Sequence, residues 1–431
     1  MMEVIVLILS FLGLLLLNVP VAFCIGLSTL FFLLVIMDFT PSVSAIAQRV
    51  ATGLDSFTLL AIPFFILAGN LMGRGGSTQR LIVLARTLVS SLPGGLAFVN
   101  IISNMFFGAI SGSAIASAAA IGSVMHPRMV TSGYSPGYSV AVNVSSATTG
   151  LVIPPSNVLI VYSLASGGLS VAALFVAGYL PGILMGLVLM IVAGVVARIK
   201  GFGASERVPL RELFRCFLDA LPSLGLIVVV IGGIVAGIFT ATEAAAIAVV
   251  YALVLSTVIY RALRLSELVE VLLDSAKTTA VVMLLIATSM ALSWALALER
   301  VPQAVGEALI ALGQNPVVFL LLVNVMLLVV GTFMDMTPAI LIFTPILLPT
   351  AMEMGIDPVH FGILMVVNLC IGLCTPPVGT VLFAGCGIAG VPVTQVVRPL
   401  LPFYIALLVA LLAVTFIPGL SLWLPRLLGL I

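Results

Sequence analysis

The polar side chains that could bind a small ligand fall into two clusters inside apolar sequence. The first cluster contains hydroxyl and amide residues and one glycine: Ser111, Gly112, Ser113, Asn143, Ser145, Ser146, Thr148, Thr149, Ser156 and Asn157. The second contains similar residues and one carboxylate: Thr332, Asp335, Thr337, Asn368, Thr375 and Thr380. Their oxygen atoms suit a small hard cation such as sodium, and free amides at a broken helix suit a carboxylate. The clusters therefore predict sites for a small cation such as sodium and for a carboxylate.

A pair of adjacent prolines interrupts the apolar sequence in each cluster, Pro154-Pro155 in the first and Pro376-Pro377 in the second. Proline removes an amide donor and prevents a helix from continuing unbroken. In a membrane, the backbone groups set free in this way must face protein or a water-filled cavity. Two broken segments in corresponding positions of two halves therefore indicate a transporter's binding site.

The predicted ligands are polar groups and backbone carbonyls at or near these breaks. For sodium they are Ser111, Gly112, Ser113, Ser145, Thr149, Gly150, Pro154, Thr332, Asp335, Thr337, Gly372, Thr375 and Pro376. For the organic substrate they are Ser111, Ser113, Asn143, Ser156, Asn157 and Thr380. Individual serines and threonines could instead serve only helix packing, as small polar residues do in membranes.

Asp335 is the sharpest single candidate, because it is the only acid between Glu307 and Glu353. An acid inside a membrane is a functional residue by default. Asp335 could also cap the helix that begins near Pro338, and the two roles are compatible.

Two other charged residues have structural alternatives. Glu243 could carry a proton, but Thr240 and Glu243 have the spacing of a capping box at a helix start, and we favour the capping role. Arg300, next to Glu299, could attract an anionic substrate, although such a pair more often marks a solvated helix end.

Composition places the whole chain in a membrane. The chain has 431 residues, of which 62% are hydrophobic and 7% charged, and its mean hydropathy is +1.37. A soluble domain carries about 25% charged residues. No Asp, Glu, Lys or Arg lies between Arg128 and Arg198, whereas one helical span needs only about 20 apolar residues. We predict an all-α polytopic membrane protein.

The sequence offers no sign of an enzyme. It contains no P-loop, dinucleotide fingerprint, zinc-protease motif or haem ligand pair, so no nucleotide or haem is expected. Cys370 and Cys374 lie one helical turn apart, but no histidine or further cysteine completes a metal site, and we interpret them as packing residues. No nucleic acid is expected as a partner.

Apolar segments divide the chain into two halves with the same order of elements: a span, an interfacial helix, a re-entrant hairpin, a proline-broken span and a further span. In the first half these are 57–72, 78–92, 94–130, 136–164 and 169–197. In the second half they are 278–298, 301–312, 315–354, 358–386 and 394–416. Outside this pattern lie spans at 4–17, 20–37, 218–239 and 242–259, and a polar connector at 38–56.

Four domains follow from this order. Residues 1–56 hold the N-terminal spans, and 57–198 form the first repeat with its hairpin at 94–130. A cytoplasmic loop and two spans occupy 199–277, and 278–431 form the second repeat with its hairpin at 315–354 and broken span at 358–386.

An offset of 222 residues relates the two halves. At this offset glycines and prolines coincide in the same order, as in Gly150 with Gly372 and Pro154-Pro155 with Pro376-Pro377, while Gly108 meets Gly331 with a slip of one residue. With five crossings between equivalent spans, the repeats are predicted to be inverted. If the N-terminus lies outside, only Arg49, Arg300 and Arg426 among the Lys and Arg residues remain outside, as the positive-inside rule expects.

Several of these residues together resemble the large membrane subunit of tripartite ATP-independent periplasmic (TRAP) transporters. The resemblance rests on FGAISGSA at 107–114, IPPS at 153–156, GIFTATEAA at 237–245, Asp335, and TPP at 375–377, and it covers essentially the whole chain. The family usually has proline where Ala241 stands here, which weakens the helix start without affecting the resemblance.

The resemblance implies sodium-coupled uptake of an organic acid, either a sialic or sugar acid or a C4-dicarboxylate, with about two or more sodium ions. It implies a periplasmic binding protein and a small four-helix membrane subunit as partners, and a multi-pass location in the bacterial inner membrane. The periplasmic N-terminus is predicted separately, from the distribution of Lys and Arg residues. The resemblance also implies the elevator-type architecture of the ion-transporter superfamily. One alternative is a self-sufficient sodium/carboxylate symporter. A second, a subunit of a proton-pumping oxidoreductase, is far less favoured, because such a subunit would carry a series of Lys and Glu residues within several spans and this sequence does not.

Overall fold

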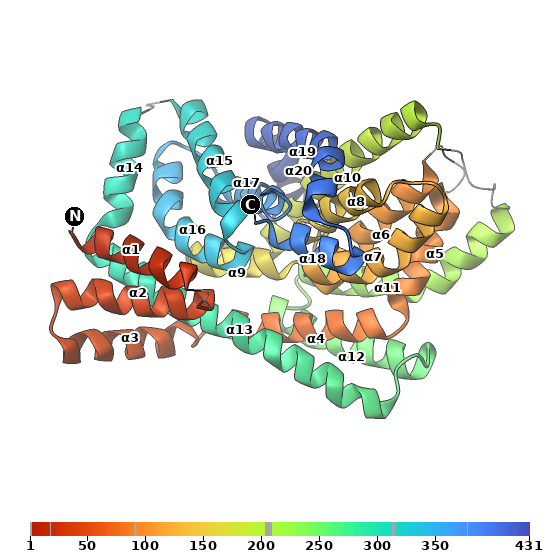
Figure 1. The fold of residues 1–431 in the computed structure, drawn as a ribbon. Helices are drawn as coiled ribbons and strands as arrows, with labels where there is room; N and C mark the ends of the chain where they lie inside the picture. The colour runs from red at the N-terminus through yellow and green to blue at the C-terminus, as the bar shows by residue number, and fades with distance from the viewer. Residues whose placement is uncertain are drawn as a thin grey trace.

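The computed structural model describes residues 2–17, 19–89, 92, 94–202, 209–312, 315–376 and 378–431. Within these ranges all regular elements are helices, as the sequence predicts. Eight of the described helices are long and apolar enough to cross a membrane. The protein is therefore a multi-pass membrane protein, and Figure 1 shows its helices arranged around a central group that contains both broken segments.

Three antiparallel helices at the N-terminus form a separate corner of the molecule, in red at the left of Figure 1. They are α1 (Met2–Leu16), α2 (Val21–Ile36) and α3 (Phe39–Gly53), and α2 and α3 contact α13. The sequence indicated only a polar connector at 38–56. This stretch instead forms α3, because its apolar residues recur on one face of a helix.

Two helices precede the first hairpin. A 3-10 turn (Phe57–Leu60) leads into α4 (Ala61–Arg74), and α5 (Ser77–Val89) is the predicted interfacial helix. The hairpin then consists of α6 (Gly95–Ser111) and α7 (Ala114–Thr131). Gly112 reverses the chain between them with φ +61°, a left-handed conformation that glycine adopts without a steric penalty.

The first broken segment consists of α8 (Pro136–Ala147), a 3-10 turn (Thr149–Leu151) and α9 (Asn157–Ala165). The helix stops before Pro154 and restarts after Ser156, as expected where proline removes an amide donor. The long helix α10 (Val171–Lys200) follows, and it is the predicted span after the break.

The middle of the chain provides α11 (Leu210–Val235), α12 (Ala241–Val254, extended by a π-helical turn at Leu255–Ile259) and α13 (Leu265–Leu298). Helix α13 begins well before the predicted span at 278–298. Its first turns are polar, so the apolar pattern identified only its later part.

The second half repeats the element order. It contains α14 (Val301–Leu312), the hairpin α15 (Pro316–Phe333) and α16 (Met336–Glu353), and the broken pair α17 (Pro358–Gly372) and α18 (Thr380–Ala389), where Pro377 lies outside the described residues. Helix α19 (Val393–Phe416) follows, and α20 (Gly419–Leu427) ends the chain. The last helix is an element that the hydrophobic pattern did not predict.

The short helix that follows each break packs against the other half of the chain. Helix α9 of the first half contacts α16 and α17 of the second, and α18 of the second half contacts α7 and α8 of the first. Similarly, α19 contacts α8, and α10 contacts α17. All residues of α8 after Pro136 and all residues of α17 after Pro358 are buried, so these two helices form the centre of the core.

Glycine pairs allow each hairpin to approach its own broken helix closely. A Cβ atom added at Gly108 on α6 would lie 2.7 Å from the Cα atom of Gly150, and one added at Gly372 would lie 2.6 Å from the Cα atom of Gly331 on α15. The backbones therefore touch at the two glycine pairs that the 222-residue offset brings into correspondence. The inversion of the halves relative to a membrane stays a prediction.

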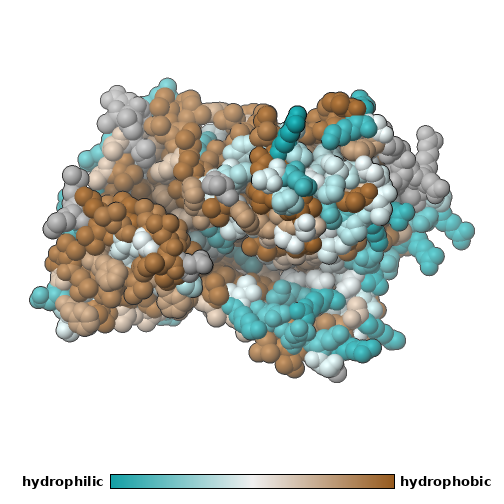
Figure 2. Space-filling model, in the orientation of Figure 1, coloured by the Kyte–Doolittle hydropathy of each residue, from teal (hydrophilic) through white to brown (hydrophobic). Residues whose placement is uncertain are grey.

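The outer surface is apolar over much of the molecule. Large exposed hydrophobic residues occur on α1, α2, α10, α11 and α19, including Leu9, Ile191 and Val228. Figure 2 shows brown apolar side chains over the N-terminal corner and hydrophilic residues gathered around the N-terminal part of α13. An apolar exterior of this kind fits contact with lipid rather than with water.

Candidate functional site

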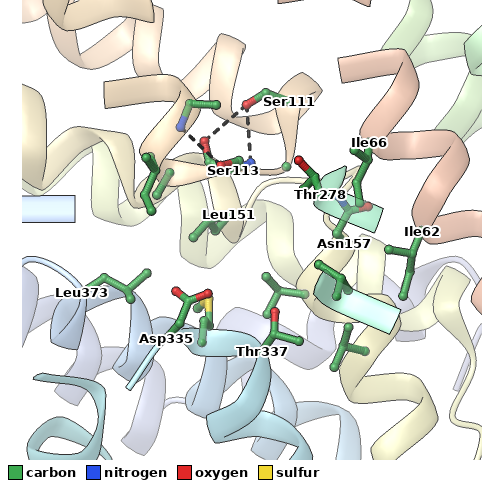
Figure 3. Close-up of a pocket in the computed structure, with 18 of the residues that line it drawn as sticks. Ile62, Ile66, Ser111, Ser113, Leu151, Asn157, Thr278, Asp335, Thr337 and Leu373 are labelled. Atoms are coloured by element: carbon green, nitrogen blue, oxygen red, sulfur yellow. Dashed lines mark hydrogen bonds between the residues drawn. The ribbon is translucent and has the colours of Figure 1, made fainter. Parts of the chain in front are cut away.

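A cavity of about 250 Å³ lies where the two hairpin tips meet. Figure 3 shows Ser111 and Ser113 on one side and Asp335 and Thr337 across from them, with Asn157 nearby. Together with Gly112, these are the sequence-predicted ligands that line the cavity. The structure thus brings some residues of both predicted clusters to a single place.

The first tip is held in shape by short local contacts. The Ser113 hydroxyl accepts a hydrogen bond from the Ala116 amide at 3.2 Å and so caps α7. The Ser111 hydroxyl lies 3.4 Å from both the amide and the carbonyl oxygen of Ser113. A Cβ atom at Gly112 would lie 2.8 Å from the Nδ2 atom of Asn157, so the tip abuts the first residue of α9.

Asn157 offers an unused acceptor to the cavity. It is the first residue of α9, and its Oδ1 atom is buried without a hydrogen-bond partner among the described residues. A buried polar atom that lacks a partner is costly. A cation or a donor on a bound ligand would satisfy this oxygen.

The second tip presents a carboxylate. Asp335 stands at the N-cap position of α16, yet its side chain makes no capping hydrogen bond, and no ion pair to it occurs within the described ranges. Its side chain is exposed to the cavity. The position at the helix start agrees with the structural alternative for Asp335, but the carboxylate oxygens remain available to a ligand.

The other predicted ligands lie behind the cavity, not on its surface. Their hydroxyl groups mostly donate to backbone carbonyls three to five residues earlier in the chain: Ser145 to Ala141 at 2.8 Å, Thr149 to Ser146 at 2.7 Å, Ser156 to Leu151 at 2.5 Å, Thr332 to Val329 at 2.7 Å and Thr375 to Ile371 at 2.6 Å. These contacts are typical of helix packing. The lone pairs of the same oxygens remain able to accept a cation.

Asn143 belongs to a separate buried network. Its amide donates to the Ala118 carbonyl at 2.8 Å, and its Oδ1 atom accepts from Asn104 at 3.1 Å. Asn104 also donates to Ser146 at 2.9 Å and accepts from Ser117 at 2.7 Å. The network joins α6, α7 and α8, so Asn143 holds the first hairpin to the first broken helix and does not line the cavity.

The backbone at the second break also connects to its hairpin. The amide of Gly379 donates to the Thr332 carbonyl oxygen at 3.0 Å, and the hydroxyl of Thr380, the first residue of α18, is buried without a partner among the described residues. Gly150, Pro154, Gly372 and Pro376 lie at or next to the two breaks. These residues support the site from behind.

One wall of the cavity was not predicted from the sequence. It is formed by α4, with Ile62, Ile66 and Asn70, and by α13, with Thr278 and Val282. Asn70 could have been noticed as the only amide in the apolar run 57–72. Thr278 gives no comparable signal, because hydroxyl residues are common in membrane helices.

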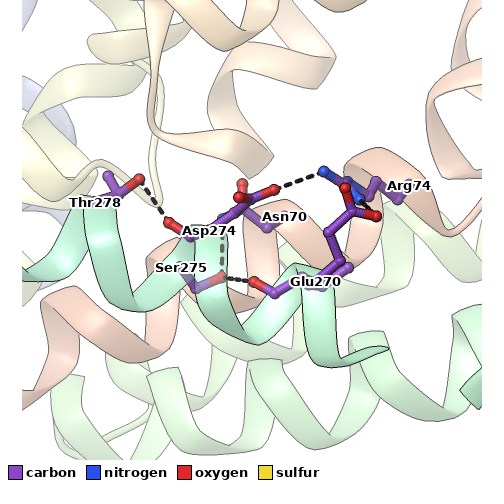
Figure 4. A network of polar contacts seen from close by, with 7 residues as sticks. Asn70, Arg74, Glu270, Asp274, Ser275 and Thr278 are labelled. Atoms are coloured by element: carbon purple, nitrogen blue, oxygen red, sulfur yellow. Dashed lines mark hydrogen bonds and ion pairs between the residues drawn. The ribbon is translucent and has the colours of Figure 1, made fainter. Parts of the chain in front are cut away.

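Polar contacts fasten this wall together, from Asn70 at the cavity to Arg74 about one turn further along α4, and Figure 4 shows these contacts. The Asn70 amide donates to the Ser275 hydroxyl at 2.8 Å. Arg74 forms ion pairs with Asp274 at 2.6 Å and Glu270 at 2.9 Å. Since two carboxylates neutralise Arg74, it does not supply a free positive charge to the cavity.

The Glu243 capping box is confirmed. The Glu243 carboxylate accepts from the Thr240 amide at 2.8 Å, and the Thr240 hydroxyl accepts from the Glu243 amide at 3.3 Å. His360 contacts the Ser421 hydroxyl at 2.7 Å, which agrees with a structural role. No group of three or more His, Cys, Asp or Glu side chains that could hold a metal occurs in the described part of the chain.

Paired hairpins and broken helices around one cavity define a class of membrane transport proteins. The chain matches the family model described as "Tripartite ATP-independent periplasmic transporter, DctM component" over residues 8–420. It belongs to this family, as the resemblance in its sequence indicated, and it is a transporter component, not an enzyme.

Individual relatives agree over nearly their whole length. The chain is 56% identical to an uncharacterized protein, YgiK, of Salmonella typhimurium, over 98% of this chain and 97% of that protein. It is 45% identical to the C4-dicarboxylate TRAP transporter large permease protein of Pseudomonas aeruginosa, over 92% and 93%. It is 37% identical to the sialic acid TRAP transporter large permease protein of Vibrio cholerae, over 97% of each.

A solved structure shares the fold. The crystal structure of the YdaH transporter of Alcanivorax borkumensis matches with a TM-score of 0.63 at 13% sequence identity, over 89% of each chain. At this identity the likeness concerns the arrangement of helices alone.

Proposed function

We propose that this chain carries an organic acid across the bacterial inner membrane together with sodium ions. One observation carries the proposal. Among the described residues that line the cavity, Asp335 is the only ionisable one, and no arginine or lysine faces it. An organic acid entering the cavity would therefore meet a like charge and no cationic side chain.

The cost of that encounter favours cotransport with a cation. Two unit charges 4 Å apart interact with about 4 kcal/mol at an effective dielectric constant of about 20. Sodium ions entering with the substrate would remove this repulsion. The hydroxyl, amide and carboxylate oxygens of Ser111, Ser113, Asn157, Asp335 and Thr337 are suitable ligands for them.

Two hairpin tips favour two or more sodium ions in each cycle. Each sodium charge that moves inward gains about 2.3 kcal/mol per 100 mV of membrane potential. Two ions would therefore offset the charge of a dicarboxylate and supply energy from the sodium gradient.

The transport movement that we propose is an elevator. The hairpins and broken helices would move as one body against α4, α13 and the other outer helices. The cavity lies at the boundary between the hairpin tips and the wall formed by α4 and α13, which is where such a movement would open and close access to a ligand.

We further propose that a periplasmic binding protein delivers the substrate, that a small four-helix membrane subunit braces the chain, and that the N-terminus faces the periplasm. The family description as one component of a tripartite system supports the two partners. The substrate would be a C4-dicarboxylate or a sialic or sugar acid, in keeping with the names of the relatives.

Reconstitution tests the proposal. Proteoliposomes containing this chain and the small subunit, supplied with the binding protein, should accumulate labelled organic acid when an inward sodium gradient is imposed. Replacing sodium by potassium should abolish accumulation. Equal uptake without sodium would overturn the ion coupling. Full uptake by this chain alone would instead identify a self-sufficient symporter.

A further inference from the structure

A second polar pocket lies between the interfacial helix α5 and the far end of the first hairpin. It has a volume of about 250 Å³, and it combines two arginines and two hydroxyl residues with apolar side chains: Ile82, Arg86, Leu96, Val99, Met125, Arg128, Thr131 and Ser132. Figure 1 shows α5 close to α6 and α7 on the right of the molecule. This pocket is separate from the cavity at the hairpin tips, and none of its lining residues is shared with that cavity.

Among the described residues, neither arginine of the pocket has a side-chain partner. No ion pair or side-chain hydrogen bond is formed by Arg86 or Arg128 within the described ranges, and no acid occurs among the lining residues. Arg80, earlier on the same helix, differs: it pairs with Asp219 at 3.4 Å, and its guanidinium lies 3.6 Å from the centre of the Tyr260 ring. Two uncompensated guanidinium groups on one pocket repel each other unless an anion lies between them.

The corresponding place in the second half has the opposite charge. A pocket of about 170 Å³ lies between α14 and α16, and its lining residues include Glu307, Thr350 and Glu353. At the 222-residue offset, Thr350 corresponds to Arg128 and Glu353 to Thr131. A pocket between an interfacial helix and a hairpin therefore does not require arginine, and the two positive charges are a particular property of the first half.

The chemistry of the pocket fits a phosphate group next to an acyl chain. Guanidinium groups bind phosphate oxygens through paired hydrogen bonds. The floor of Ile82, Leu96, Val99 and Met125 suits hydrocarbon. Basic pockets between membrane helices on the cytoplasmic side commonly receive anionic lipid headgroups, and the distribution of charge along the chain predicts that side for Arg86 and Arg128.

We propose that Arg86 and Arg128 form a phosphate-binding pocket between α5 and α7 that receives the headgroup of an anionic phospholipid. The bound phosphate connects α5, which is packed on α11, to the hairpin whose other end carries the Ser111–Ser113 tip. Free phosphate shares the same charged chemistry, so the test has to separate the two sources.

The test measures lipid binding to the purified full-length chain in detergent. Native mass spectrometry would follow titration with dioleoylphosphatidylglycerol, with dioleoylphosphatidylcholine as the zwitterionic comparison. Binding of phosphatidylglycerol should weaken about tenfold or more in Arg86→Gln/Arg128→Gln, since losing charged hydrogen bonds of this kind exceeds the 1.4 kcal/mol that corresponds to tenfold. Arg86→Lys/Arg128→Lys should retain part of the affinity.

A matched control removes the same charge elsewhere. Arg211→Gln/Arg215→Gln changes two exposed arginines of α11 that line neither pocket and should leave binding within about twofold of the original, as expected for charges outside the site. Equal weakening in both double variants would show general charge attraction and overturn the proposal. Unchanged binding in Arg86→Gln/Arg128→Gln would overturn it as well.

Sodium phosphate provides the second arm. Displacement of phosphatidylglycerol by millimolar phosphate, dependent on Arg86 and Arg128, would support a phosphate site occupied by lipid. Binding of inorganic phosphate without binding of phosphatidylglycerol would overturn the lipid assignment. Unfolding temperatures of all variants would show whether each remains folded, and because both arginines are exposed, we expect no loss of fold.

Discussion

The Cys370 thiol donates a hydrogen bond to the Thr148 carbonyl oxygen at 3.3 Å, and these two residues are 222 positions apart. That separation is the offset at which the glycines and prolines of the two halves coincide. A residue meets its own counterpart only where it lies on the axis that relates two equivalent parts. The contact therefore marks the place where a two-fold axis would pass, between the ends of α8 and α17.

The cavity between the tips lies near this centre, and its function can be tested at Asp335. Replacing Asp335 by Asn removes the one ionisable group among the described residues that line the cavity, while retaining the size of the side chain. We expect the sodium concentration for half-maximal uptake to rise about tenfold or more, because interactions with a charged group contribute about 1.5–3 kcal/mol.

Two comparisons sharpen the Asp335 experiment. Glu353→Gln removes an exposed carboxylate from the other end of α16 and should leave the sodium dependence unchanged. Ser113→Ala should weaken sodium binding and also cost about 1 kcal/mol of stability, because it removes the cap of α7. Identical sodium dependence in Asp335→Asn and the unaltered protein would exclude the second tip from the ion site.

The close approach of hairpin and broken helix can be tested at the glycine pairs. Gly108→Ala and Gly372→Ala place a Cβ atom against backbone of the facing element, 2.7 Å and 2.6 Å from its nearest Cα atom. Forcing extra atoms into a packed core typically costs about 1–3 kcal/mol. Both variants should therefore unfold at lower denaturant concentration in detergent.

Control glycines exist on neighbouring helices. A Cβ atom at Gly232 on α11 or at Gly387 on α18 would meet nothing within 4 Å. Alanine at these helical positions should leave stability unchanged or raise it by about 0.5–1 kcal/mol. If all four alanine variants behaved alike, the glycine contacts would not be limiting the distance between the elements.

A substitution at Glu243 can distinguish helix capping from proton transfer. Glutamine at the third helical position preserves a capping box but carries no titratable proton. We expect Glu243→Gln to retain both stability and uptake. Thr240→Ala should lower the free energy of unfolding by about 1 kcal/mol through loss of the cap. Loss of uptake in Glu243→Gln with unchanged stability would restore the proton-carrier interpretation.

The sequence predicted the tips and breaks well because their signals are local. Proline and glycine act on their own backbone, so Pro154, Gly112 and the run around Asp335 could be placed without knowledge of the fold. The turn of the second hairpin comprises only Met334 and Asp335, since Thr332 still belongs to α15 and Thr337 already belongs to α16.

Other features depend on contacts between distant segments and could not be read in this way. Asn70 and Thr278 join the cavity only because α4 packs against α13. Asn143 does not line the cavity, because its side chain forms hydrogen bonds with Asn104 and with the Ala118 carbonyl oxygen. Helix α3 was not predicted, because the prediction for residues 38–56 rested on their polar composition and not on their amphipathic pattern.

The packing of α9 and α18 on the opposite halves has a consequence for the origin of such a chain. Helix α9 is packed on α16 and α17, and α18 on α7 and α8. A protein of half this length would leave its short helix without the surface that buries it and would lack half of its cavity. It could complete its core only by assembling with a second copy. If the present gene arose by duplication, the contacts between its two halves would first have been contacts between the two subunits of a dimer.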